Sequence, residues 1–239
     1  MHSIKGIIFD YGGTLDTNGT HWFHIFRQIY SELLPHITEE QLREAYIYAE
    51  RYLATHRTIA PCDDFLSMLH KKVALQMSLL MSSADENKSP DAISRVAEAC
   101  DIHVRSCMKQ TRKLLDTLSA HYPLVLVSNF YGNIHAVLRS YGIDGYFCEV
   151  IESAVVGIRK PDPRIFALGV EALGFKPEEI LVTGDSYSKD IVPAHSLGCH
   201  TVWLKGQGWI TDNEDTDCPA ANAVIGDIAE LLSIVDLYE

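Results

Sequence analysis

The chain has 239 residues, of which 47% are apolar and 22% charged, a composition typical of ordinary globular proteins and not of disordered ones. Its net charge of -12 argues against a surface for polymeric nucleic acid or for an anionic membrane, because both repel negative charge. No apolar stretch is long enough to span a bilayer, and the N-terminus lacks a signal-peptide core. The six cysteines show no CxxC spacing, so we expect reduced thiols in a cytoplasmic protein.

Short apolar runs bounded by Gly, Pro or Asp recur along the chain. They cover residues 4–10, 124–129, 180–185 and 200–204, with weaker candidates at 147–151 and 223–225. Continuous apolar runs of this length predict strands that are buried on both faces, as in a parallel sheet. Helical patterns of crossover length lie between them. The sequence therefore predicts an α/β fold with a doubly wound, Rossmann-like parallel sheet.

Residues 17–105 interrupt this alternation with helical patterns alone. A capping box begins at Thr38, an apolar stripe follows from Leu66 to Leu80, and Ser89-Pro90 predicts the start of another helix after a loop at 81–89. We therefore predict an all-helical cap domain, 17–105, inserted into an α/β catalytic core formed by 1–16 and 106–239.

Polar side chains follow several of the predicted strands. Asp10 ends the first, Ser128 and Asn129 end the second, and Asp185 ends the run at 180–185, with Asp190 five residues later. The carboxyl ends of parallel strands lie at one edge of the sheet, where ligands bind. Carboxylates gathered there repel one another unless a cation such as Mg²⁺ lies between them, and Mg²⁺ is commonly shared with phosphate.

Four motifs together resemble the haloacid dehalogenase superfamily, in its branch with a helical cap inserted after the first strand. They are FDYGGTLD with Asp10, VLVSN with Ser128 and Asn129, RKPDPRIF with Lys160, and LVTGDSYSKDI with Asp185 and Asp190. Their order and spacing match the superfamily, and the resemblance covers essentially the whole chain.

The resemblance implies a phosphatase mechanism. Asp10 would attack phosphorus to form an aspartyl-phosphate, and Lys160 would neutralise the charge of the transferring group. The residues implied to shape the phosphate loop or to bind the substrate oxygens are Gly13, Thr14, Ser128 and Asn129.

The resemblance also implies a bound Mg²⁺. Its ligands would be the carboxylates of Asp10 and Asp185, the carboxylate of Asp190 directly or through water, and the main-chain carbonyl of Gly12.

Gly12 departs from the superfamily pattern, since phosphatases of this type usually carry there a second Asp that protonates the leaving group and later activates water. A positioned acid or base contributes about 100-fold to 10,000-fold in rate. We therefore expect slow turnover of alkyl phosphates, and a smaller loss with acyl, anhydride or aryl phosphates. Residues considered as substitutes, each expected to be structural or solvated, are Asp16, His21, His24 and His56.

These observations favour a Mg²⁺-dependent phosphatase for a small phosphorylated metabolite. One alternative is a phosphonate hydrolase that forms a Schiff base with a cap lysine, Lys71 or Lys72, although such a helix-surface pair is usually solvated. Another is a catalytically weak homologue that binds a phosphorylated ligand or a protein. The substrate and the oligomeric state do not follow from the sequence.

Overall fold

A parallel sheet lies at the centre of the computed structural model, which describes residues 3–80, 90–209 and 218–236. The sheet has six strands in the order β3-β2-β1-β4-β5-β6. Their bounds are β1 Gly6–Phe9, β2 Leu124–Ser128, β3 Phe147–Glu152, β4 Ile180–Gly184, β5 His200–Leu204 and β6 Ala223–Ile225. Each neighbouring pair is parallel. The predicted doubly wound α/β sheet is confirmed, including its two weaker strands.

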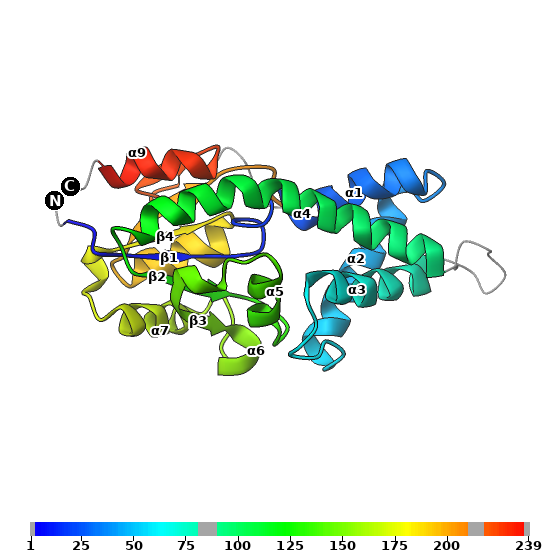
Figure 1. The fold of residues 1–239 in the computed structure, drawn as a ribbon, viewed down its shortest axis with the longest axis horizontal. Coiled ribbons are helices and arrows are strands. Elements are labelled where there is room, and N and C mark those ends of the chain that lie inside the picture. The colour runs from blue at the N-terminus through cyan, green and yellow to red at the C-terminus, as the bar shows by residue number, and fades with distance from the viewer. Residues whose placement is uncertain (1–2, 81–89, 210–217, 237–239) are drawn as a thin grey trace.

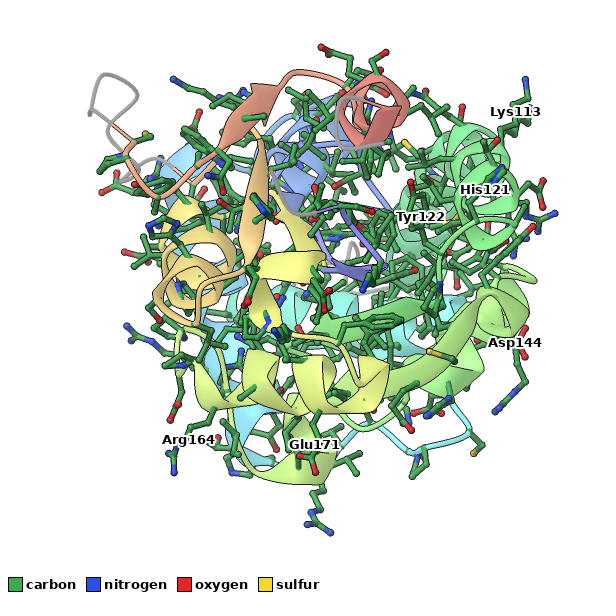
Figure 2. The ribbon with its side chains drawn as sticks, turned by 90° about the vertical axis from the view of Figure 1, so that its left-hand side faces the viewer. Lys113, His121, Tyr122, Asp144, Arg164 and Glu171 are labelled. Carbon is green, nitrogen blue, oxygen red and sulfur yellow. The ribbon has the colours of Figure 1, made fainter. Side chains whose placement is uncertain are left out.

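Alternate residues of the central strands face opposite layers of helices. Ile7 of β1 packs in a cluster with α4 (Pro90–Ser119) and α9 (Leu231–Asp236), whereas Ile8 packs with α7 (Arg164–Leu173) and α8 (Val192–Ser196). Figure 1 shows α4 and α9 on one side of the strands and α7 on the other. In Figure 2, Arg164 and Glu171 lie on the outer side of α7, away from the sheet. The short helices α5 (Ile134–Ser140) and α6 (Ser153–Val156) follow β2 and β3.

Three further helices follow β1 and lie beside the carboxyl end of the sheet (Figure 1). They are α1 (Trp22–Leu33), α2 (Glu39–Thr55) and α3 (Phe65–Leu80), and we call them the cap helices. The predicted capping box at the start of α2 is present, because Thr38 Oγ1 accepts from Gln41 N at 3.3 Å and Gln41 Oε1 accepts from Thr38 N at 2.9 Å. The loop predicted at 81–89 lies outside the described residues.

Helix α4 runs without a break through the boundary predicted near residue 105. Its N-terminal part packs against α1 and α3, and its C-terminal part, with Leu114, Leu115 and Leu118, joins the cluster on the sheet. We propose that the cap comprises the cap helices and the N-terminal part of α4, so that one rigid element connects cap and core. Among the described residues no helix has both the length and the apolar character to cross a membrane. A cytoplasmic location stays a prediction.

The order of the strands reverses direction at β1. From β1 the chain adds β2 and β3 on one side, and later adds β4, β5 and β6 on the other. Crossovers that diverge in this way leave a crevice at the carboxyl ends of the two central strands, which is where ligands bind in open α/β sheets. Asp10 directly follows β1, and Asp185 directly follows β4.

Candidate active site

Lys160 joins two carboxylates that follow different strands, since Asp10 comes directly after β1 and Asp190 lies in the helical turn after β4. Its Nζ lies 2.6 Å from Asp10 Oδ1 and 2.7 Å from Asp190 Oδ1, and all three residues are buried. Burial acts to lower the pKa of Lys160, but the charges of Asp10 and Asp190 outweigh it and raise this pKa. The ammonium is therefore charged where it touches Asp10.

Asp185 completes a group of three carboxylates with Asp10 and Asp190. One oxygen of each lies within 4.8 Å of the others. Burial raises the pKa of Asp10 to about 6 although Lys160 acts to lower it, and burial and the charges of Asp10 and Asp190 raise the pKa of Asp185 well above its usual range. A single ammonium thus leaves these three carboxylates with excess negative charge, which a divalent cation with hard oxygen ligands would balance.

The turn after β1 brings Thr14 against this cluster. The amides of Thr14 and Leu15 both donate to the Tyr11 carbonyl, at 3.2 and 2.9 Å. Thr14 Oγ1 lies 3.0 Å from Asp10 Oδ2 and 3.4 Å from Asp185 Oδ1, and it accepts from Asp185 N at 3.0 Å. Thr14 therefore links the ends of β1 and β4, and it stands behind the cavity described below, not in its lining.

Gly13 permits this turn through its backbone. Its φ is +98°, and a β-carbon there would lie 2.3 Å from Asp185 Oδ2. Its N–H donates to Asp16 Oδ1 at 2.7 Å and so is already engaged. A substrate-binding role for Gly13 and Thr14 stays a prediction, whereas both contribute to the shape of the turn.

Gly12 differs from Gly13 in its backbone conformation and in the space around its α-carbon. Its φ lies outside the left-handed region, and among the described residues no atom lies within 4 Å of the β-carbon that another residue would add. Gly12 also lines the cavity. The position therefore has room for a side chain, which the protein does not use.

Ser128 and Asn129 lie at the end of β2, and both line the cavity. Asn129 Oδ1 accepts from Lys160 N at 2.9 Å, and Asn129 Nδ2 donates to Lys160 O at 3.2 Å. The side chain predicted to hold substrate oxygens thus binds the main chain of Lys160 in this structure.

The cavity lies between the strand ends and the cap helices and has a volume of about 300 Å³. Its floor includes Asp10, Lys160, Asp185 and Asp190. This volume is at the lower end of the range for small-molecule sites, about 300–1,000 Å³. The aromatic residues that also line the cavity come from the cap helices and two core loops: Trp22, Tyr46, Phe65, Phe130, Tyr131 and Trp209.

An ion pair between a buried lysine and a partly exposed glutamate faces the same cavity from the cap side. Lys72 Nζ contacts Glu50 Oε1 and lies 3.2 Å from Tyr131 Oη, which donates to Glu50 Oε2 at 2.7 Å. Burial acts to lower the pKa of Lys72, but the negative charge of Glu50 has the larger effect and raises this pKa. For Glu50, burial acts to raise the pKa, but Lys72 and Tyr131 together lower it. Both groups are therefore charged.

The expectation of a solvated lysine pair is wrong for Lys72. Its side chain is 6% exposed, whereas Lys71 lies farther out and contacts Asp63 and the Thr58 carbonyl. The sequence does contain an indication that Lys72 is buried, because Phe65, Leu69 and Lys72 follow helical spacing and lie on the buried face of α3. A charged ammonium is not the neutral amine that a Schiff base requires, so the pairing with Glu50 disfavours the phosphonate-hydrolase alternative.

Of the four residues considered as substitute acids or bases, only His21 lines the cavity. Its Nδ1 accepts from Phe23 N at 3.2 Å, which places the proton of the neutral ring on Nε2, and burial lowers its pKa to about 4. The ring is thus neither a ready acid nor a free base at neutral pH. Asp16 is held by Gly13 and by Trp22 Nε1.

The two remaining histidines have structural partners. His24 Nε2 lies 2.9 Å from the Gly208 carbonyl oxygen. The exposed His56 ring stacks on Tyr52, with 4.1 Å between ring centroids. Neither lines the cavity.

Comparisons with known proteins agree with this arrangement. A family model described as haloacid dehalogenase-like hydrolase matches residues 4–198. Haloacid dehalogenase-like hydrolase domain-containing protein 3 of Mus musculus is 28% identical over 145 residues, which are 61% of this chain and 53% of that protein. Glyceraldehyde 3-phosphate phosphatase of Pyrococcus furiosus is 35% identical over 95 residues, 39% of each chain.

A crystal structure of a dehalogenase with an intermediate complex has a TM-score of 0.63 at 19% identity, covering 98% of both chains. At this identity the likeness concerns the fold alone. The matched segments span about half, or less, of the length of the two relatives from Mus musculus and Pyrococcus furiosus.

Proposed function

The chain belongs to the haloacid dehalogenase-like hydrolase family, and we propose that it is a Mg²⁺-dependent phosphatase acting on a small phosphorylated metabolite. The observation that carries this proposal is the contact of Lys160 with both Asp10 and Asp190 at the floor of the cavity. Relatives named as phosphatases of glyceraldehyde 3-phosphate and of phosphoserine support the choice of a small phosphorylated substrate.

In the proposed reaction an oxygen of Asp10 bonds to phosphorus while the bond from phosphorus to the leaving-group oxygen breaks. The leaving group departs with the electron pair. Water then attacks the aspartyl-phosphate, which releases inorganic phosphate and restores the carboxylate. Lys160, held against Asp10, would neutralise charge on the transferring group, and Ser128 in the cavity wall would donate to its oxygens.

The donor set of the acidic cluster fits Mg²⁺, because its carboxylate oxygens are close together and carry excess negative charge. Asp10, Asp185, Asp190 and the main-chain carbonyl of Gly12 would hold the ion. When bound, Mg²⁺ would balance the carboxylates and attract the phosphate dianion.

The decisive experiment uses acetyl phosphate, whose leaving group needs little protonation and little space. We expect release of inorganic phosphate that requires Mg²⁺ and falls at least about 1,000-fold in Asp10→Asn, because the amide cannot serve as the nucleophile. Asp162→Asn, which changes a partly exposed carboxylate paired with Arg164 outside the cavity lining, is the matched control. Absence of turnover in the wild type, with a phosphorylated ligand still raising the melting temperature, would favour the binding-module alternative.

A further inference from the structure

Lys72 offers a hydrogen-bond donor to the cavity from the cap side. Because Glu50 balances the charge of its ammonium, the pair as a whole carries no net charge. An ammonium has three N–H donors. Two have partners, Glu50 Oε1 and Tyr131 Oη, and within the described chain Lys72 Nζ has no third acceptor. Because Lys72 lines the cavity, the remaining donor is available to a bound molecule there.

The surroundings of this donor are aromatic. The rings of Phe26, Tyr46 and Tyr131 have centroids 5.5–5.8 Å from Lys72 Nζ. Beside them, the Tyr46 and Trp209 rings are stacked with 5.8 Å between centroids. Both rings also line the cavity. A flat apolar group would bury its surface here, whereas a second anionic group would face Glu50 as well as Lys72.

The residues at the floor of the cavity also favour an aromatic leaving group, for a chemical reason. Gly12 supplies no acid to protonate a departing oxygen, and His21, which also lines the cavity, is held as a neutral ring. Phenols have a pKa of about 10, as in tyrosine, compared with about 15.7 for water. A phenolate therefore leaves without a proton far more readily than an alkoxide.

Resting on the proposed phosphatase function, we propose that the substrates are aryl phosphate monoesters whose ring carries no second charge and has a neutral acceptor oxygen opposite the phosphate. The ring lies among the aromatic side chains of the cap side, and the acceptor receives the free N–H of Lys72. In the reaction the aryl oxygen–phosphorus bond breaks, the phenolate departs with the electron pair, and it later takes a proton from water.

Non-hydrolysable phosphonates test the subsite without turnover. The probes are benzylphosphonate and its 4-acetyl and 4-carboxy derivatives, and the measurement is Kd by calorimetry with Mg²⁺ present. We expect the 4-acetyl compound to bind about tenfold more tightly than benzylphosphonate, since it gains a charge-assisted hydrogen bond. The 4-carboxy compound should gain nothing. Equal affinity of the 4-acetyl and unsubstituted compounds, or tightest binding of the 4-carboxy compound, would overturn the proposal.

Variants assign the effect to Lys72. Lys72→Met alone would leave Glu50 unpaired, so the test uses the charge-neutral pair Glu50→Gln with Lys72→Met, in which the tenfold preference should fall to about onefold. Lys71→Met, the neighbour outside the cavity, should keep it. The wild-type series stands even if the double variant does not fold, and persistence of the preference in a folded double variant would contradict the proposal. Acetyl phosphate hydrolysis distinguishes failure of the proposed phosphatase function from failure of the proposed subsite. Absence of this hydrolysis would contradict the phosphatase function. Equal Kd values for the 4-acetyl and unsubstituted compounds would contradict the subsite.

Discussion

Asn129 holds the main chain of Lys160 at both polar groups. Its Oδ1 accepts from Lys160 N at 2.9 Å and its Nδ2 donates to Lys160 O at 3.2 Å. The Lys160 ammonium then reaches Asp10, 2.6 Å away. The loop after β2 therefore fixes the base of the side chain that neutralises the proposed nucleophile, through a residue of a different motif.

We expect Asn129→Ala to lower kcat for acetyl phosphate about 10-fold to 100-fold, because an ångström-scale shift of Lys160 misplaces its charge. The change in KM should be smaller. Steady-state kinetics would measure the changes in kcat and KM separately, and matching circular dichroism spectra would show that the variant is folded. Asn222→Ala is the matched control, since Asn222 also binds main chain, at Thr201 N, but lies away from the cavity. An unchanged kcat in Asn129→Ala would mean that other contacts suffice to place Lys160.

Gly12→Asp should raise kcat/KM for alkyl phosphates such as glycerol phosphate by about 10-fold or more. The substitution restores an acid in open space, on a backbone that any residue adopts. Phosphate release from an alkyl and an acyl substrate would be compared, and the gain should be larger for the alkyl ester. A fall in activity with both would show that the cavity requires glycine at this position.

Gly13→Ala is the contrasting variant. Its φ of +98° and the approach of its β-carbon to Asp185 predict a loss of about 1–3 kcal/mol in the free energy of unfolding, together with loss of activity. Urea unfolding measures this loss. Equal stability of the two glycine variants would contradict the structural difference between these positions.

The sequence predicts the sheet well because strands buried on both faces require continuous apolar runs, which are local signals. It also predicts that Asp10, Asp185 and Asp190 gather, because strand ends share one edge, whereas Lys160 lies on a loop and its place in the site is what the family resemblance implies. It does not predict the partner of Asn129. That contact joins residues 129 and 160, and its geometry depends on how two loops pack.

The cap side is the part that the sequence predicts least. Lys72 and Glu50 lie on separate helices, and Tyr131 follows a core strand, so their contacts depend on how the cap closes over the core. Lysine on a helix is usually solvated, and only the buried spacing of Lys72 within α3 indicates otherwise.

Asp16 should make stability depend on pH. Burial raises its pKa to about 7, although hydrogen bonds from Gly13 and Trp22 act to lower it. The folded protein therefore binds more protons than the unfolded chain between pH 4 and about 7, so the free energy of unfolding falls as pH rises through this window. A tenfold difference in proton affinity between the folded and unfolded states is worth about 1.4 kcal/mol, which gives a loss of a few kcal/mol that is complete above about pH 7.

Urea unfolding from pH 4 to 8 in saturating Mg²⁺ measures this dependence. Asp16→Asn should be less stable at pH 4, because one oxygen cannot serve both Gly13 N and Trp22 Nε1, but its free energy of unfolding should fall less toward pH 8. Parallel pH profiles for the variant and the wild type would show that Asp16 is ionised throughout.

Removal of one carboxylate of the acidic cluster should have opposite effects on the metal-free and the metal-bound protein. The raised pKa of Asp185 means that its ionised form destabilises the fold at pH 8 when no divalent cation is present. We expect Asp185→Asn to have the higher melting temperature in EDTA. In the wild type, Mg²⁺ at about 100 times its Kd should add about 2.7 kcal/mol to the free energy of unfolding.

The variant should lose most of that increment, because an amide oxygen replaces a charged ligand. Thermal unfolding in EDTA and in a Mg²⁺ series measures both effects without any substrate. Asp162→Asn, at a partly exposed ion pair outside the acidic cluster, should follow the wild type in both conditions. The informative result is a reversal of the order of stability, with Asp185→Asn more stable than the wild type in EDTA and less stable at high Mg²⁺ concentration. Such a reversal ties the charge of Asp185 to a bound cation. A variant that is less stable in EDTA as well would assign Asp185 a purely structural role.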